Sequence, residues 1–515
     1  MFETEEQFSR FSGLPANSEL FDQLNMDVVE ECLCGFSSSF PKQFIHIMNP
    51  DYKVAEYRFE VFRDLYKESA WKYAEELCNH ISSLHSKAEA INNMPDSTQK
   101  KIANVHVAAQ YFTLLEQICS FASSCHFYGL HRILDVFQPY LQNMKIANEK
   151  SAVFKTENFL NSFLRISIKI DRIRKKITFV EPECETFTDL QTLDNLCQRL
   201  TGVPVLQPFS IVDANSPTIL EKISIDYILE KNECLAKAIK ETPDVDINWE
   251  QLILFQTQIS FYVAFIKLAE QLEKKGLPFC FAGFDETCRF CAHGIYDLSL
   301  SIHRMEDVDF CQTQNDIDLD NNTLGFILTG ANQGGKTTFL RATGISVYLS
   351  MCGCPAPAKS IILRPYRAIV ALFGGEEDRK NESSRFELEV KKYCFHRDNL
   401  VDSTFVLLNE FFTGTNRIEE VNILGQCLIE LINKHVTFGC VTHFQEVCEI
   451  LGDSVNSRIQ YLRAEHPTVV NGKKRYIIEK GFPDGRAYSE NIVRNLGMTY
   501  DSLLRQFEER GICGV

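Results

Sequence analysis

The hydrophobic period along the chain changes three times, and each change marks a region with a different expected structure. Between residues 49 and 150 apolar side chains recur every three or four positions, and glycine and proline are scarce. One such stripe consists of Phe112, Leu115, Ile118 and Phe121. This period predicts long helices with a buried apolar face. Residues 1–45 are expected to form an N-terminal cap.

A period of two replaces the helical spacing near residue 163. The alternating apolar positions are Leu164, Ile166, Ile168 and Ile170. They predict a strand, and residues 177–180 are its expected partner in a β-hairpin insertion near 163–182. A basic cluster stands near the turn: Arg172, Arg174, Lys175 and Lys176. This cluster is the chain's best candidate for DNA contact, and the alternative is a solvated hairpin tip.

Helical spacing returns after residue 224. Its clearest apolar stripe consists of Phe255, Ile259, Tyr262 and Ile266. The stripe stops before residues 276–278, whose glycine and proline terminate helices. Residues 46–294 are therefore expected to be mainly helical. After residue 295 strand-like apolar runs alternate with helical ones, which predicts an α/β domain over residues 295–515 and an α+β multidomain fold.

Composition narrows the class of protein. A chain of 515 residues is long enough for several cores. No stretch reaches the roughly 18 uninterrupted apolar residues of a membrane span, and the N-terminus is acidic, unlike a secretory signal. With 19 cysteines expected as reduced thiols, we predict a cytoplasmic protein without a membrane partner. The net charge of −16 weakens the case for DNA binding, yet it is compatible with a local basic groove.

Four residues of types that can bind metals fall close together after the long helices. They are Cys280, Cys288, Cys291 and His293. A C-x-x-C pair is compatible with a zinc site. The chain has no second such pair at zinc-ribbon distance, so free buried thiols are the favoured interpretation.

A glycine-rich loop carries the clearest chemical signal. The apolar residues 324–329 predict a buried strand, and the loop that follows matches G-x-x-x-x-G-K-[ST]. In such a loop backbone N–H groups wrap phosphates, the lysine reaches the β- and γ-phosphates, and the hydroxyl binds Mg²⁺. The pattern predicts a site for ATP and Mg²⁺. Its residues are Gly330, Asn332, Gly334, Gly335, Lys336, Thr337 and Thr338.

Two further strand ends complete the expected site. Residues 404–408 are followed by Asn409 and Glu410, where a P-loop ATPase has Asp-Glu. Glu410 is expected to orient the attacking water as a general base. The Asn409 amide oxygen lacks the negative charge that helps to hold Mg²⁺, so we expect ATP to bind and turnover to be slow. His443 follows residues 438–442 and is expected to sense the γ-phosphate, with a structural histidine as the alternative.

Together these segments resemble the ATPase module of the MutS mismatch-repair family, a branch of the ABC ATPases. The glycine-rich loop is similar to the family's T-G-P-N-M-G-G-K-S-T, and residues 353–358 are similar to its G-x-x-V-P-A. Residues 374–389 resemble G-A-x-D-D…S-T-F-x-x-E, residues 409–415 resemble D-E-x-x-x-G-T, and residues 442–444 match T-H-[FY]. The motifs cover residues 295–500 and imply an ABC-type P-loop ATPase domain.

The helical half resembles the family's core and lever region more weakly, in residues 49–64 and 261–280. It looks like a short MutS-related subgroup without the mismatch-reading and connector domains, in which asparagine replaces the Walker B aspartate. The family's Phe-x-Glu wedge lies in a domain that this chain is expected to lack. Mismatch recognition is therefore not carried over.

The resemblance also implies a partner subunit. Ser384 matches the serine that contacts the nucleotide of the other subunit, and a helix cap is its alternative role from sequence alone. A site completed in this way implies a homodimer. Apolar stripes on both sides of Gly497 predict a C-terminal helical pair, which belongs either at the dimer interface or against the ATPase core.

Two functions fit these observations. The first is a slow dimeric ATPase that acts on or near DNA, in a role related to mismatch repair or recombination. The second is a nucleotide-dependent protein-binding switch without DNA contact. A repair ATPase with a long coiled coil is excluded because no sustained heptad run is present, and a transporter ATPase because the L-S-G-G-Q signature is missing.

Overall fold

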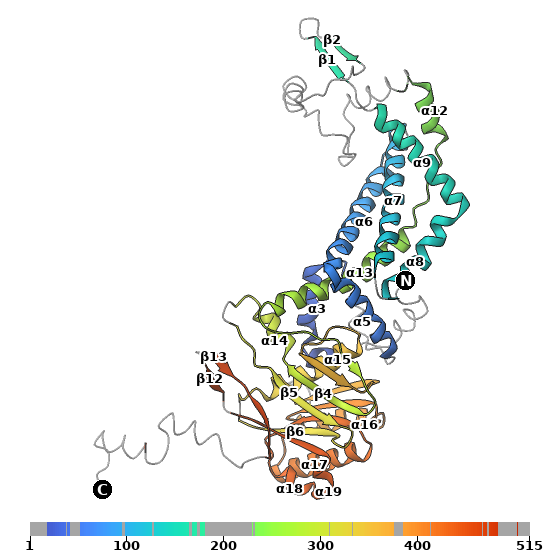
Figure 1. Ribbon diagram of the computed structural model, residues 1–515. Helices are drawn as coiled ribbons and strands as arrows, with labels where there is room; N and C mark the ends of the chain where they lie inside the picture. The colour runs from blue at the N-terminus through green and yellow to red at the C-terminus, as the bar shows by residue number, and fades with distance from the viewer. Residues whose placement is uncertain are drawn as a thin grey trace, which may run out of the picture. The chain divides into compact units, whose positions relative to one another are not determined.

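The computed structural model describes most of the 515-residue chain (Figure 1). The described residues are 18–37, 39–41, 52–94, 98–125, 128–163, 167–171, 176–180, 229, 232–307, 310–331, 333–374, 385–412, 414–465, 467–470, 473–482 and 502. The fold is α+β, with helices in the first half and mixed sheets in the second, as predicted. The chain forms two compact units. The helical unit consists of residues 1–5 and 63–260, and the sheet unit consists of residues 6–62 and 261–515. The expected boundaries at 45/46 and 294/295 remain predictions.

The helical unit is built around α7. Its helices are α6 (Ala70–Asn92), α7 (Thr98–Ser124), α8 (Tyr128–Gln142), α9 (Met144–Phe163) and α12 (Glu233–Glu241), with the short η1 (Lys67–Ser69) before them. Figure 1 shows α6 and α7 side by side, and α7 also packs on α8, α9 and α12. The predicted stripe at residues 112–121 is confirmed, because its four side chains are buried in α7. Apolar residues all round α7 explain its central place.

The predicted β-hairpin is confirmed. Strand β1 (Ser167–Asp171) pairs antiparallel with β2 (Lys176–Val180), and Ser167 lies opposite Val180. Three residues of the basic cluster, Arg172, Arg174 and Lys175, lie outside the described residues. Their assignment to DNA contact therefore remains a prediction.

A six-stranded sheet forms the centre of the sheet unit. Its order is β14-β11-β6-β10-β9-β8. The strands are β6 (Gly325–Gly330), β8 (Ala368–Phe373), β9 (Thr404–Asn409), β10 (Thr437–Val441), β11 (Ile459–Ala464) and β14 (Ile478–Lys480). All neighbours pair in parallel except β14 on β11. Strands buried on both faces read as continuous apolar runs, which is why three of them could be predicted from the sequence.

A second sheet has the order β3-β7-β4-β5. Its strands are β3 (Gly283–Phe284), β4 (Cys288–Ile295), β5 (Asn315–Asp320) and β7 (Ser360–Leu363). The region up to residue 294, expected to be mainly helical, thus ends in two strands. Two short strands, β12 (Thr468–Val470) and β13 (Lys473–Arg475), pair with each other.

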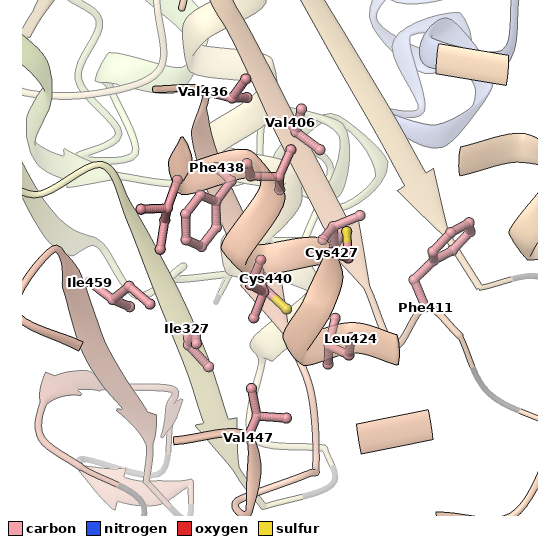
Figure 2. Packing of buried hydrophobic residues seen from close by; sticks show 14 of the residues in the cluster. Ile327, Val406, Phe411, Leu424, Cys427, Val436, Phe438, Cys440, Val447 and Ile459 are labelled. Carbon is pink, nitrogen blue, oxygen red and sulfur yellow. The ribbon is translucent and has the colours of Figure 1, made fainter. Parts of the chain in front are cut away.

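Helices cover both faces of the six-stranded sheet. The helices that lie wholly or mainly in the sheet unit, apart from α13, are α2 (Ser18–Gln23), α3 (Met26–Phe36), α5 (Tyr52–Tyr66), α14 (Leu298–His303), α15 (Lys336–Met351), α16 (Arg385–Arg397), α17 (Arg417–Asn433), α18 (Val447–Ile450) and α19 (Asp453–Asn456). Helix α15 contacts the six-stranded sheet and also β4 of the second sheet. Helices α17 and α18 cover the opposite face, and Figure 2 shows Leu424 and Val447 packed with Ile327, Phe438 and Cys440 of the strands. The parallel sheet is therefore a central buried layer.

The N-terminal helices belong to the sheet unit. Helix α2 packs on β8, and α3 packs on α14. Leu24 lies so close to Gly344 of α15 that a Cβ on this glycine would be 2.6 Å from it. Lys392 Nζ donates to Glu19 Oε1 at 2.6 Å. These contacts join residues 18–36 to β8, α14, α15 and α16 of the same unit.

Helix α13 (Trp249–Glu273) is the one described helix that is long and apolar enough to cross a membrane. Its apolar window has a mean hydropathy of 1.5, but 72% of the window is buried within the protein. Burial of this extent is typical of a core helix, so length and composition alone are weak evidence for a span.

Candidate functional site

The loop after β6 takes a shape that only glycine allows at two positions. Gly330 has a φ of 125°, and a Cβ there would lie 2.4 Å from Ala464 O. Gly335 has a φ of 86° and precedes the first residue of α15. A side chain at either position would be strained or would clash. The strand–loop–helix geometry expected from the motif is present in the described part of the loop.

Lys336 lies under this loop. Its Nζ donates to Gly330 O at 2.9 Å and to Ala331 O at 3.2 Å, and the side chain is buried. Burial lowers the pKa of Lys336, while the Glu410 carboxylate opposes that effect. The ammonium group is thus held at the N-terminus of α15, where backbone N–H groups and the helix dipole also favour an anion.

Thr337 and Asn409 meet between the first helix turn and the end of β9. Thr337 Oγ1 donates to Asn409 Oδ1 at 3.2 Å. Magnesium prefers carboxylate and phosphate oxygens in an octahedral shell. Both oxygens here are neutral, so they fit an Mg²⁺ ion that arrives with a nucleotide better than a resident ion.

Glu410 lies at the end of β9 in a left-handed backbone conformation, with a φ of 48°. Its N–H donates to Val441 O at 2.9 Å, which ties the ends of β9 and β10 together. His443 Nδ1 lies 3.3 Å from Glu410 Oε1. The interaction with His443 is the main cause that lowers the pKa of Glu410, and the charges of Lys336 and Arg385 lower it further. The carboxylate is therefore ionised near neutral pH.

These residues surround one cavity of 830 Å³. Seven of the predicted site residues line it: Gly334, Gly335, Lys336, Thr337, Thr338, Glu410 and His443. Gly330 and Asn409 lie just behind the lining, where they accept hydrogen bonds from Lys336 and Thr337. Asn332 and Ser384 lie outside the described residues, so their predicted roles stay predictions. The volume is within the range of small-molecule sites.

The opposite wall of the cavity was not predicted from the sequence. It includes Tyr296, Asp297, Phe310 and Tyr476. Asp297 is 1% exposed, caps α14 and pairs with Arg341 of α15 at 3.2 Å. Tyr476 lies against Gly335, with its Cβ 3.1 Å from where a glycine Cβ would stand. No short motif joins these residues, because the fold brings them together from separate segments.

The cysteine cluster separates into parts. Cys288 Sγ and Cys291 Sγ lie 3.0 Å apart, and Cys291 Sγ donates to Asp318 Oδ1 at 2.8 Å. A bulge between Cys288 and Phe290 turns both thiols to one side of β4. The His293 side chain pairs with Asp316 instead. The backbone of Cys280 forms an antiparallel β-bridge with Ala356. Among the described residues, no group of three or more His, Cys, Asp or Glu side chains is arranged to hold a metal ion.

The region in which this chain is similar to known proteins contains most residues of the candidate site. Residues 326–486 match the model of the family MutS domain V, and this range contains the whole glycine-rich loop together with Asn409, Glu410 and His443. The DNA mismatch repair protein MutS of Thermotoga petrophila is 30% identical over 137 residues, which cover 27% of this chain and 17% of that protein. The protein of the same name from Thermotoga sp. strain RQ2 matches with the same identity and coverage. The similar region thus spans less than a fifth of the length of these relatives. Residues 326–486 are thus similar to domain V of the MutS family.

Proposed function

We propose that the chain is a MutS-like ATP-binding protein and a slow ATPase, with an ABC-type P-loop domain in its second half. One observation carries the proposal: Lys336, Thr337, Glu410 and His443 come from three strand ends and line the same cavity of 830 Å³. A general base, a phosphate-binding loop and a polar sensor at one point are the elements that phosphoryl transfer to water requires.

The chain's own residues have distinct roles in the proposed reaction. Backbone N–H groups of the loop bind the phosphates at the N-terminus of α15. Lys336 leaves the carbonyl oxygens of Gly330 and Ala331 and bonds to the β- and γ-phosphates. Glu410 orients the attacking water and takes its proton, and His443 contacts the γ-phosphate. Thr337 and Asn409 would hold Mg²⁺, which supplies positive charge at the phosphates when bound.

Slow turnover follows from Asn409. An amide oxygen offers a dipole where a carboxylate offers a full charge, so Mg²⁺ is held less firmly beside the phosphates. Lys336 and Thr337 are still present to bind ATP, and Glu410 is still present to activate water. We therefore expect measurable binding and weak hydrolysis.

The proposed assembly is a homodimer that acts on or near DNA, and the proposed location is the cytoplasm. The relatives are named as DNA mismatch repair proteins, and the family resemblance gives Ser384 to the partner's nucleotide site. A protein-binding switch without DNA contact remains the second candidate, because Asn409 also suits a chain that binds ATP without hydrolysing it.

Steady-state phosphate release by the unmodified protein, with and without duplex, mismatched and branched DNA, separates the two candidates. The proposal expects slow release that Lys336→Ala removes, together with a DNA mobility shift. Release at the contaminant level that neither Asn409→Asp nor Mn²⁺ restores would leave the switch. Mixed Lys336→Ala and Ser384→Ala chains should regain partial activity if a dimer shares its sites, whereas fully active monomers would rule the shared site out.

A further inference from the structure

Two positions beside the candidate site carry a different charge from the motifs that this region resembles. Residue 409 is asparagine where the motif has aspartate, and residue 385 is arginine where S-T-F has threonine. Each difference makes the site more positive by one unit charge. The two act in the same direction, in a chain whose net charge is −16.

Arg385 lies close to the reacting end of the site. It is the first residue of α16, and its Nη2 is 2.7 Å from where a Cβ on Gly374 would stand. The same point is 2.5 Å from Glu410 O, and Gly374 N donates to Asn409 O at 2.8 Å. Because Gly374 has no side chain, the guanidinium lies directly beside the ends of β8 and β9. Its charge also contributes to the lowered pKa of Glu410.

The charges at the phosphate end balance one another in the part of the chain that the structure describes. Arg385 Nε donates to Glu389 Oε1 at 3.0 Å, and Glu389 is buried. Lys336 and Glu410 are the other two fully charged side chains there, and His443 pairs with Glu410. Two cations, Lys336 and Arg385, thus stand beside two carboxylates, Glu389 and Glu410. With aspartate at position 409 and threonine at position 385, the net charge of these side chains would be −2.

The wall of the cavity adds further cations. Arg304 and Lys474 line it together with Lys336, and Arg304 Nε also pairs with Asp307 Oδ2 at 2.8 Å. Of the described carboxylates in the lining, Asp297 pairs with Arg341, and Glu410 pairs with His443. A triphosphate that enters this cavity meets a described lining with more positive than negative side chains. In a negatively charged site a divalent cation must first screen the repulsion between site and phosphates.

We propose that this site binds ATP largely without a divalent cation, with Arg385 supplying part of the positive charge that Mg²⁺ supplies in a site with aspartate at position 409. The inference rests on the proposed nucleotide site. It assigns to Arg385, which lies behind the cavity lining, an electrostatic role in phosphate binding, and it makes Mg²⁺ a requirement for hydrolysis more than for binding.

The test is the affinity for a fluorescent ATP analogue measured in excess Mg²⁺ and in excess EDTA. We expect the two dissociation constants of the natural protein to agree within about 10-fold. A unit charge about 8 Å away at an effective dielectric constant near 20 changes an equilibrium by roughly 30-fold. The Arg385→Thr/Asn409→Asp protein should therefore bind at least about 30-fold more weakly in EDTA than in Mg²⁺.

Three variants separate charge from packing. Arg385→Lys keeps the charge and should keep the EDTA affinity. Arg397→Gln removes an exposed arginine at the far end of α16, where it pairs with Glu430, and should change neither constant. Asn409→Asp alone adds a negative charge without a change in size, so it tests the same electrostatics if Arg385→Thr, which removes the Arg385 Nε bond to buried Glu389, fails to fold.

The outcomes are distinct. An EDTA affinity of the natural protein more than about 100-fold below its Mg²⁺ affinity would overturn the inference and leave the nucleotide site intact. The inference is likewise overturned if Asn409→Asp and the double variant keep the natural ratio. Absence of binding in both buffers would instead refute the proposed nucleotide site itself.

Discussion

A glutamate–histidine pair occurs in each unit of the molecule, and the two pairs have different surroundings. In the helical unit His106 Nδ1 of α7 lies 3.5 Å from Glu157 Oε1 of α9, and Glu157 borders a cavity of 330 Å³. In the sheet unit His443 Nδ1 lies 3.3 Å from Glu410 Oε1, and both residues line a cavity of 830 Å³. The distances are similar, yet only the second pair lines a cavity together with the glycine-rich loop.

The backbone explains the difference. Side chains on packed helices are distributed along the helix axes. The first pair therefore connects only α7 and α9. Parallel strands instead end at one edge of a sheet, and the loops that follow them converge there. Glu410 thus lies near Lys336 and Arg385, whose charges lower its pKa. Residue types alone therefore do not identify a reactive pair, because its neighbours depend on the kind of element that carries it.

The largest expected effect separates the two pairs directly. Glu410→Gln should keep ATP binding and reduce turnover by about 10² to 10⁴, because an amide cannot accept the water's proton. Glu157→Gln is the matched control and should leave turnover within about 2-fold. Phosphate release at saturating ATP measures both. Equal losses in the two variants would contradict the role given to Glu410.

A lysine beside each cavity provides the second test. Lys336→Ala should weaken ATP binding by roughly 100-fold or more, because a cation at the β- and γ-phosphates is lost. Lys87 borders the smaller cavity and donates to Gln110 at 3.0 Å, so Lys87→Ala should leave the affinity unchanged. Titration with a fluorescent ATP analogue measures both variants. Undiminished binding by the Lys336→Ala protein would refute the assigned site.

The third prediction concerns a residue of the sheet unit, Asn409. Asn409→Asp should raise Mg²⁺ affinity and speed hydrolysis by about 10-fold, because a full charge replaces a dipole beside the ion. The rate as a function of Mg²⁺ concentration measures this effect. Asn416→Asp is a suitable control, since Asn416 caps α17 through Glu419 N and aspartate caps helices equally well. A slower Asn409→Asp enzyme would mean that the amide is required.

The smallest expected effect concerns pH. Because the pKa of Glu410 is lower in the folded chain than the ordinary 4.5, its contribution to folding is present above the unfolded value and is lost as pH falls through the folded one. His443→Ala removes the main cause, so the acid limb of the rate profile should move to higher pH by less than about one unit. His106→Ala should leave that limb in place. An unmoved limb in the His443→Ala protein would mean that this pair does not set it.

The sequence alone determined the parts of the molecule that depend on neighbouring residues. Apolar runs identified β6, β9 and β10, because strands buried on both faces need no polar positions. Helical spacing identified the buried face of α7. The glycine-rich loop was recognisable because the backbone at Gly335 has a positive φ, which favours glycine directly before Lys336.

Only the tertiary structure decided which distant segments meet. Strand order placed Glu410 and His443 next to the loop after β6, and no local pattern encodes that order. It brought Asp297 and Tyr476 to the other wall of the cavity, and it paired His293 with Asp316 and not with Cys288 and Cys291. The fold also placed Arg385 beside Gly374. Long-range packing creates these contacts, so the charge of the site could be counted only after the chain had folded.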